Sequence, residues 1–281
     1  PRFRHDTDYR YPDFILYCCV HDTFSRHLSK LDFDVLINLH PNERCSFIDA
    51  MTSVKLRTGT THKIFKWFWD VFTPLDRSMH AADMYLDVLQ QLGVQNLSNN
   101  GLEIFPGEEH FLEAELFWQE QNITDQDKLI GFNIGSAVPT KRWPPERFAE
   151  VADIFAAKGY KTVFFGGPMD EEMVAEATGY MQTRPIIATG HFAIGGLAAA
   201  MRRCCLIITN DSGPMHVAIS QKVPIVAMYG PSNPKLYGPY TKDAVIVTAQ
   251  PPCQGCLLGK VVQMLLRNSI FALLNADITV F

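Results

Sequence analysis

Hydrophobic and polar positions in the second half of the chain alternate between two patterns. Short apolar runs, typical of buried strands, are each followed by apolar residues at helical spacing. The first pair is a strand at Leu129 to Ile134 and a helix from Pro144 to Gly159. The further predicted elements are a strand at Thr162 to Phe165, a helix at Asp170 to Met181, a strand at Ile186 to Ala188, a helix at Ile194 to Met201, a strand at Leu206 to Thr209, a helix at Pro214 to Ser220, and strands at Ile225 to Tyr229 and Ala244 to Thr248. This alternation predicts a parallel sheet with helices on both faces, a doubly wound α/β domain.

The first hundred residues show a similar pattern with fewer elements. Phe14 to Cys19 and Val35 to Leu39 are predicted strands, with a helix at Phe24 to Leu31 between them. Ala81 to Leu92 has apolar residues at helical spacing and predicts a further helix. A second α/β unit is therefore expected in this half.

A polar segment separates the two halves. Asn96 to Glu109 is rich in Asn, Ser, Gly and Pro, and the domain boundary is expected just after it, within Phe111 to Asp127. We therefore predict an N-terminal α/β domain at residues 1–115 and a C-terminal Rossmann-like domain at residues 116–281. The cleft between two such sheets is the expected active site.

Composition narrows the class of protein. Hydrophobic residues make up 47% of the 281 residues and charged residues 20%, which is typical of a globular protein. The net charge of -5 gives no positive field for nucleic acid, so we expect no nucleic-acid partner. The seven cysteines, an odd number, lie partly in apolar runs and indicate a reducing compartment, hence a cytoplasmic location. The apolar runs are shorter than the roughly 20 residues of a membrane-spanning helix.

The segment from Thr209 to His216 joins a predicted strand to a predicted helix. Asp211 or Ser212 is expected to cap that helix, and Gly213 allows a ligand to approach closely. Because free N–H groups and the helix dipole favour negative charge there, the segment predicts an anion site. A capped helix that binds no ligand is the open alternative.

A second segment, Asn133 to Trp143, follows another strand of the same domain. Ser136 and Thr140 offer hydroxyls to a diphosphate, and Lys141 and Arg142 offer it positive charge. The alternative is a solvated basic turn above Trp143. The spacing of a P-loop is absent.

Several short motifs follow one another in a fixed order. They are Asn133 to Gly135 with Lys141 to Pro144, Phe165 to Pro168 with the acidic run Asp170 to Glu172, Asn210 to His216, Tyr229 to Pro234, and Gly238 to Tyr240. Their order and spacing resemble glycosyltransferase family 9, the heptosyltransferases of lipopolysaccharide synthesis. The resemblance implies a GT-B fold, in which two Rossmann-like doubly wound domains face a cleft. The C-terminal domain would bind a nucleotide-sugar, usually ADP-heptose, and the N-terminal domain the acceptor.

The resemblance also implies roles for individual residues. Those that would bind the donor are Gly135, Ser136, Lys141, Glu171, Phe192, Asp211, Ser212, Gly213 and His216. Ser136 and Lys141 would meet the diphosphate, while Arg142 would face solvent. An acidic residue among Asp170 to Glu172, taken as Glu171, would hold the ribose, and Phe192 would line the adenine pocket. Lys141, Asp211 and His216 are the expected catalytic residues. The family's catalytic base is an aspartate in a Gly-Asp loop near its N-terminus, which is expected before Pro1 and thus outside this sequence.

Metal chemistry has weak support. Asp32-Phe33-Asp34 and Asp125-Gln126-Asp127 match a metal-binding pattern of other glycosyltransferases, but the pattern is too short to be specific. Cys253 and Cys256 have zinc spacing without a second pair to complete four ligands. His80 begins a helix and could reach an acceptor, but it is expected only to cap or pack that helix. We expect no metal and no cofactor.

These observations predict an inverting, metal-independent glycosyltransferase. It would move a sugar, most simply heptose, from ADP-heptose to a lipopolysaccharide core or another glycan. Two alternatives stay open: a nucleotide-sugar or glycan-binding protein without catalysis, and a GT-B nucleotide-sugar epimerase. The expected partners are the donor and a glycan or glycolipid acceptor, with peripheral contact at the inner membrane surface.

Overall fold

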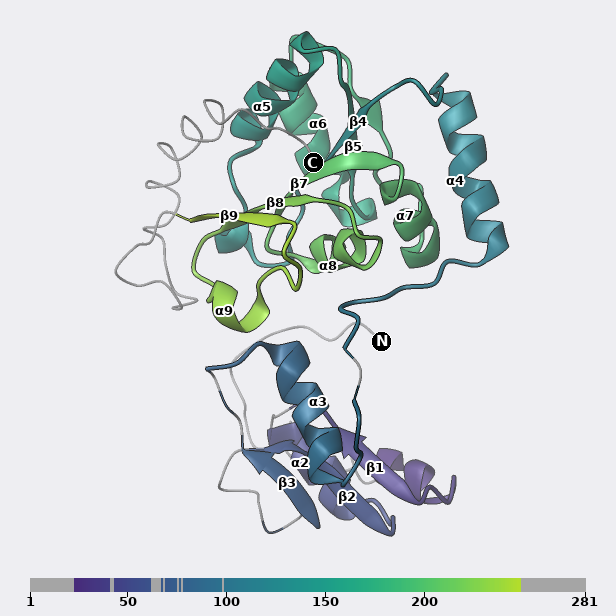
Figure 1. Ribbon diagram of the computed structural model, residues 1–281, viewed down its shortest axis with the longest axis vertical. Coiled ribbons are helices and arrows are strands. Elements are labelled where there is room, and N and C mark those ends of the chain that lie inside the picture. The colour runs from purple at the N-terminus through teal and green to yellow at the C-terminus, as the bar shows by residue number, and fades with distance from the viewer. Residues whose placement is uncertain are drawn as a thin grey trace. The chain divides into compact units, whose positions relative to one another are not determined.

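The computed structural model describes residues 23–40, 43–61, 67, 69–74, 76, 78–97 and 99–248. The chain forms two compact units, which divide between Ser98 and Asn99 (Figure 1). The expected strand at Phe14 to Cys19 and the pair Cys253 and Cys256 lie outside the described residues.

The first unit contains a parallel sheet whose described strands have the order β1-β2-β3. These strands are β1 (Val35–Asn38), β2 (Leu56–Thr61) and β3 (Val71–Pro74), and the helices are α2 (Glu43–Met51) and α3 (Ala81–Gln91), with residues 23–29 also helical. His80 precedes α3, and its Nδ1 accepts a hydrogen bond from the backbone N–H of Ala82 at 3.1 Å. The expectation that His80 caps a helix is therefore confirmed.

The second unit is a parallel sheet of order β6-β5-β4-β7-β8-β9. Its strands are β4 (Leu129–Asn133), β5 (Lys161–Phe165), β6 (Ile186–Ile187), β7 (Cys204–Asn210), β8 (Ile225–Tyr229) and β9 (Ala244–Thr248). Its helices are α4 (Glu108–Glu120), α5 (Pro145–Ala157), α6 (Glu171–Tyr180), α7 (Ile194–Met201), α8 (Gly213–Ser220) and α9 (Pro234–Tyr237). The alternation that the sequence predicts from Leu129 onward is thus confirmed.

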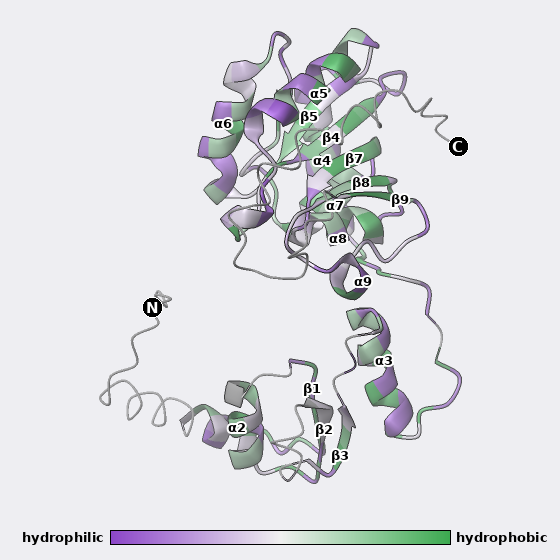
Figure 2. Cartoon of the chain, turned by 90° about the vertical axis from the view of Figure 1, so that its left-hand side faces the viewer, coloured by the Kyte–Doolittle hydropathy of each residue, from purple (hydrophilic) through white to green (hydrophobic). Residues whose placement is uncertain are grey.

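Helices cover both faces of this sheet because successive strand residues point to opposite sides. On one face Ile130 of β4 and Ile208 of β7 pack against α5 and α6. On the other face Leu129 and Ile207 pack against α4, α7 and α8. Figure 2 shows the hydrophobic residues concentrated on the inner strands, with hydrophilic residues on the outer sides of the helices. The two cores hold the strand ends in fixed positions.

Helix α5 illustrates how local sequence sets these elements. Its buried positions include Phe148, Ala152 and Phe155, which recur at helical spacing and face the core. Pro144 and Pro145 suit the first turn, where no N–H donor is needed. Gly159 has a φ of 86° and ends the helix, since this left-handed conformation is easy only for glycine.

The division of the chain lies earlier than the expected boundary after residue 115. Helix α4 spans that position, yet its Ala114, Phe117 and Trp118 are buried in the core of the second unit. Because those side chains pack beside α7, the whole helix belongs to the second unit. The junction between the two units therefore lies near the start of the polar segment Asn96 to Glu109, not after its end.

The strand order reverses between β4 and β7. The chain runs outward from β4 to β5 and β6 on one side, and from β7 to β8 and β9 on the other. Crevices at the carboxyl ends of the two central strands are where open α/β sheets bind ligands. The topology alone thus directs attention to the residues that follow Asn133 and Asn210. In the part of the chain that the structure describes, no helix is long and apolar enough to cross a membrane.

Candidate functional site

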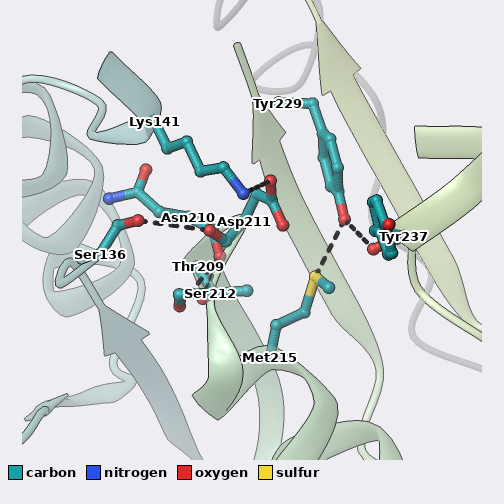
Figure 3. A network of polar contacts seen from close by, with 9 residues as sticks. All are labelled: Ser136, Lys141, Thr209, Asn210, Asp211, Ser212, Met215, Tyr229 and Tyr237. Atoms are coloured by element: carbon teal, nitrogen blue, oxygen red, sulfur yellow. Dashed lines mark hydrogen bonds and ion pairs between the residues drawn. The ribbon is translucent and has the colours of Figure 1, made fainter. Parts of the chain in front are cut away.

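The candidate site is built on the last residues of β4 and β7. Asn133 ends β4 and stands beside Thr209 of β7 in the parallel register, so Asn210 lies one residue further along. Both asparagines are fully buried. A loop of residues 134–143 follows the first strand, and a short turn at residues 211–212 follows the second. Figure 3 shows the side chains of these two segments converging.

Lys141 and Asp211 form an ion pair across the two segments. Lys141 ends a short 3₁₀ helix, Pro139–Lys141, and its Nζ lies 2.7 Å from the Oδ2 of Asp211. The side chain of Asp211 is 6% exposed and that of Lys141 is 20% exposed. Ser136 lies beside the pair and donates its hydroxyl to the backbone oxygen of Asp211 at 3.4 Å. The structure thus brings together three residues that the sequence singled out.

The asparagines join the two segments by further hydrogen bonds. Asn133 Nδ2 donates to Thr209 Oγ1 at 3.1 Å and to Ser212 Oγ at 2.9 Å. Asn210 Nδ2 donates to the carbonyl of Ile134 at 2.7 Å, and its Oδ1 accepts from the N–H of Trp143 at 3.0 Å. Sequence reasoning assigned neither asparagine a role of its own. The signal that would have found them is an amide residue at the end of each of two strands beside the switch point.

Arg142 does not simply face solvent, as the sequence analysis expected. It is half-buried, and its Nε donates to the backbone oxygen of Ser136 at 2.8 Å. This hydrogen bond connects the two ends of the loop, because Ser136 lies near its start and Arg142 near its end. The arginine therefore stabilises the loop that carries Lys141.

The start of α8 differs in detail from the expected cap. Ser212 occupies the N-cap position with an extended backbone, but its side chain makes no capping hydrogen bond to the helix. Its hydroxyl is engaged elsewhere, by Asn133 and by the carbonyl of Asn210 at 3.3 Å. The carboxylate of Asp211 is turned to Lys141. The expectation that either side chain caps α8 is wrong, because both are used to join the two segments.

Gly213 and His216 lie in the first turn of α8. A Cβ atom built on Gly213 would meet no other atom within 4 Å, so the space beside this glycine is open. His216 is half-buried on the same turn. The helix therefore presents its N-terminal end without a side chain over Gly213, an arrangement suited to an anion.

Tyr229, the last residue of β8, lies beside Asp211 (Figure 3). Its hydroxyl donates to the carbonyl of Tyr237 at 2.9 Å and lies 3.7 Å from the sulfur of Met215. Burial, and then the negative charge of Asp211, raise the pKa of Tyr229 well above its usual range. The phenol therefore stays neutral and contributes no charge to the site.

Gly135 lies where β4 and β5 end side by side. A Cβ on Gly135 would come 2.2 Å from Asp170 Oδ1, so a larger residue would displace this carboxylate. The Oδ2 of Asp170 accepts the N–H of Gly167 at 2.9 Å. The carboxylate of Asp170 thus stabilises the turn that follows β5.

Glu171 and Phe192 lie on the β5 and β6 side of the sheet. Glu171 begins α6, and a Cβ on Gly190 would come 2.9 Å from its Oε1, so this carboxylate lies beside the turn that leads to Phe192. The Phe192 ring is half-buried and packs 5.1 Å from Phe117, centroid to centroid. The neighbouring ring of His191 is exposed, which makes it a surface aromatic that sequence reasoning missed.

The acidic patterns considered for metals have structural contacts. Asp34 pairs with Lys55 at 2.5 Å on the surface. Asp127 Oδ2 accepts the backbone N–H and the hydroxyl of Thr124, each at 2.8 Å, and these bonds lower its pKa. The described residues contain no cluster of three or more His, Cys, Asp or Glu side chains that could hold a metal ion.

Comparisons with known proteins agree with this architecture. A crystal structure of a glycosyl transferase family 9 protein from Veillonella parvula is 52% identical, with a TM-score of 0.74, and the match covers 88% of this chain and 69% of that one. Escherichia coli ADP-heptose lps heptosyltransferase II has the same fold at 23% identity and a TM-score of 0.66, over 92% of this chain and 81% of that one. The expected α/β fold of GT-B type is thereby confirmed.

Curated relatives match part of the chain. Lipopolysaccharide heptosyltransferase 2 of Salmonella typhimurium is 33% identical over 140 residues, which are 48% of this chain and 40% of that protein. The chain thus matches less than half the length of this relative. Residues 22–262 match the family described as glycosyltransferase family 9 (heptosyltransferase), and the chain therefore belongs to that family.

Proposed function

We propose that the protein is an inverting, metal-independent heptosyltransferase that transfers heptose from ADP-heptose to a lipopolysaccharide core or another glycan. The observation that carries this proposal is the convergence of the Lys141 ammonium, the Ser136 hydroxyl and the N-terminus of α8 at the switch point of the sheet. All three are partners for a diphosphate.

The chemistry follows from where charge develops. An acceptor hydroxyl attacks the anomeric carbon on the face opposite the diphosphate and loses its proton to a base. A new carbon–oxygen bond forms, the bond to the phosphate oxygen breaks, and its electron pair leaves with the diphosphate. Lys141 and the dipole of α8 stabilise that growing negative charge.

Asp211 has a different task from Lys141 in this proposal. A buried carboxylate beside a diphosphate would repel it, but the ion pair neutralises Asp211 and fixes the ammonium in place. His216, in the first turn of α8, would contact the sugar or phosphate. Glu171 and Phe192, on the β5 and β6 side, would take the ribose and the adenine.

The relatives support the choice of donor and acceptor. The Salmonella typhimurium relative is named a lipopolysaccharide heptosyltransferase, and the Escherichia coli structure is titled as an ADP-heptose enzyme. A glycolipid acceptor would bring the protein to the inner membrane surface from the cytoplasmic side. We propose no metal, since the cationic groups above suffice for the diphosphate. We also propose no cofactor and, because the net charge is -5, no nucleic-acid partner.

Transfer is tested with the whole protein, ADP-heptose and a lipopolysaccharide core that lacks heptose. Mass spectrometry is expected to show one added heptose, and NMR an anomeric configuration inverted from that of the donor. EDTA should leave both donor affinity and transfer unchanged. Rescue of an EDTA-treated sample by magnesium would contradict the metal-independent proposal. Binding without transfer, or an epimerised sugar formed without acceptor, would contradict the transferase proposal.

A further inference from the structure

The side chain of Asn210 bonds to both ends of the loop that carries Ser136 and Lys141. Its Nδ2 donates to the carbonyl of Ile134 at 2.7 Å, where the loop leaves β4. Its Oδ1 accepts from the N–H of Trp143 at 3.0 Å, just before α5 begins. One carboxamide on β7 therefore bonds to both ends of the loop that follows β4.

These hydrogen bonds are shielded from water. Asn210 and Ile134 are 0% exposed and Trp143 is 1% exposed. Water therefore has no ready access to replace a lost bond, and an unpaired buried backbone group is costly. A carboxamide suits this position because it offers one donor and one acceptor at the end of a short side chain.

The position of Asn210 links these bonds to the ion pair. Asp211 follows Asn210 directly in the chain, and Lys141 lies two residues before Trp143. The amide therefore sets the spacing between the backbone that carries Asp211 and the backbone that carries Lys141. Across the same two segments, the Nζ of Lys141 lies 2.7 Å from the Oδ2 of Asp211.

We infer that Asn210 is a positioning residue, which holds loop 134–143 so that Lys141 and Ser136 face a donor diphosphate. The donor part of this inference rests on the proposed function, whereas the loop restraint does not. Asn210 itself is fully buried and acts through the loop. Its removal should weaken donor binding without removing any charge.

The loop restraint is tested first, by hydrogen exchange of peptides that cover residues 134–143. Asn210→Leu keeps a similar size but offers no hydrogen bond, and it should speed exchange in this loop at least about tenfold. Asn210→Asp keeps an acceptor for Trp143 but sets an oxygen against the carbonyl of Ile134. This second variant should loosen the loop mainly near Ile134, and it serves if the leucine variant does not fold.

The coupling to Lys141 is tested by a double-mutant cycle. Calorimetry with ADP-heptose should show an affinity loss of about tenfold for Asn210→Leu in the wild-type chain. In a Lys141→Ala background the same change should cost less than about twofold, because the ammonium that it positions is already gone. A full tenfold loss in both backgrounds would contradict positioning through Lys141.

Asp153 supplies the matched control. Its carboxylate accepts hydrogen bonds from Gln182 and Thr183, which precede the edge strand β6, away from the central strands β4 and β7. Asp153→Ala should lower the melting temperature without changing exchange in loop 134–143 or the donor affinity. An equal effect of Asp153→Ala on donor affinity would show that general destabilisation explains the result.

The outcomes separate this inference from the proposed function. If the wild-type chain fails to bind ADP-heptose while Asn210→Leu still loosens the loop, the proposed donor is wrong and the loop restraint holds. If the wild-type chain binds the donor and Asn210→Leu changes neither exchange nor affinity, the inference is overturned.

Discussion

The Nζ of Lys141 lies 2.7 Å from the Oδ2 of Asp211 at the junction of β4 and β7. Because both side chains are mostly buried, their pairing differs from that of an exposed salt bridge. Loss of one partner would leave the other charge without compensation. Lys141 is therefore expected to matter for folding stability as well as for donor binding.

Lys141→Ala should lower the free energy of unfolding by about 3 kcal/mol, because it leaves the Asp211 carboxylate buried and unpaired. Donor affinity should fall as well, by about 1.5 to 3 kcal/mol for a lost charge-assisted hydrogen bond. Urea unfolding and calorimetry with ADP-heptose measure the two effects. The double variant Lys141→Met with Asp211→Asn should recover stability but not affinity. Recovery of affinity in the double variant would rule out a direct role for the ammonium.

Arg142→Ala should weaken donor binding less than Lys141→Ala but by a measurable amount. The change removes the hydrogen bond from Arg142 to Ser136 that closes the loop, and it leaves the ammonium in place. Arg147 is the control, since it forms an exposed pair with Glu150 on α5. Calorimetry should rank the affinity losses as Lys141, then Arg142, then Arg147, the last near zero. Equal losses for Arg142→Ala and Arg147→Ala would show that loop closure is irrelevant to the donor.

Gly213→Val should fold but lose the donor. The structure leaves open space where its side chain would lie, so the melting temperature should change little. The same side chain would occupy the space beside the N-terminus of α8, where the diphosphate is proposed to bind. His216→Ala should instead reduce turnover with the fold retained. Wild-type donor affinity in a folded Gly213→Val variant would place the donor elsewhere.

The first unit should lose stability as the pH rises from about 4 to about 6. Burial raises the pKa of Asp49 to about 6, against the opposing effects of the hydrogen bond from Asn38 and the charge of Arg57. The folded state thus holds this proton more tightly than the unfolded chain. Stability from this group is greatest below its unfolded pKa and falls by roughly 3 kcal/mol through this range.

Asp49→Asn tests this pH dependence. The variant keeps the shape of the side chain but has no proton to lose, so its contribution should not fall between pH 4 and pH 6. The measurement is the difference in unfolding free energy between wild type and variant across that range, because other carboxylates contribute to both. A constant difference would mean that Asp49 does not titrate in this range.

The sequence by itself determined the doubly wound sheet of the second unit. The periodicities of strands and helices are local properties of the sequence. The apolar run Leu129 to Ile134 therefore predicts β4, and the spacing of Phe148, Ala152 and Phe155 predicts α5, whatever lies next to them in the fold. The same holds for the turn at Asp211 to Gly213, where a strand ends and a helix begins. Local sequence therefore identifies the candidate residues of the site.

Only the tertiary structure decided what those residues bond to. Asn210 reaches Trp143 and Ile134, and Asn133 reaches Ser212, because β4 and β7 lie side by side although β5 and β6 separate them in the chain. No local pattern encodes that adjacency. Because the two strands are adjacent, Asp211 and Ser212 bond to Lys141 and Asn133 instead of capping α8. In the same way, α4 belongs to the second unit because its aromatic side chains are buried in the core of that unit.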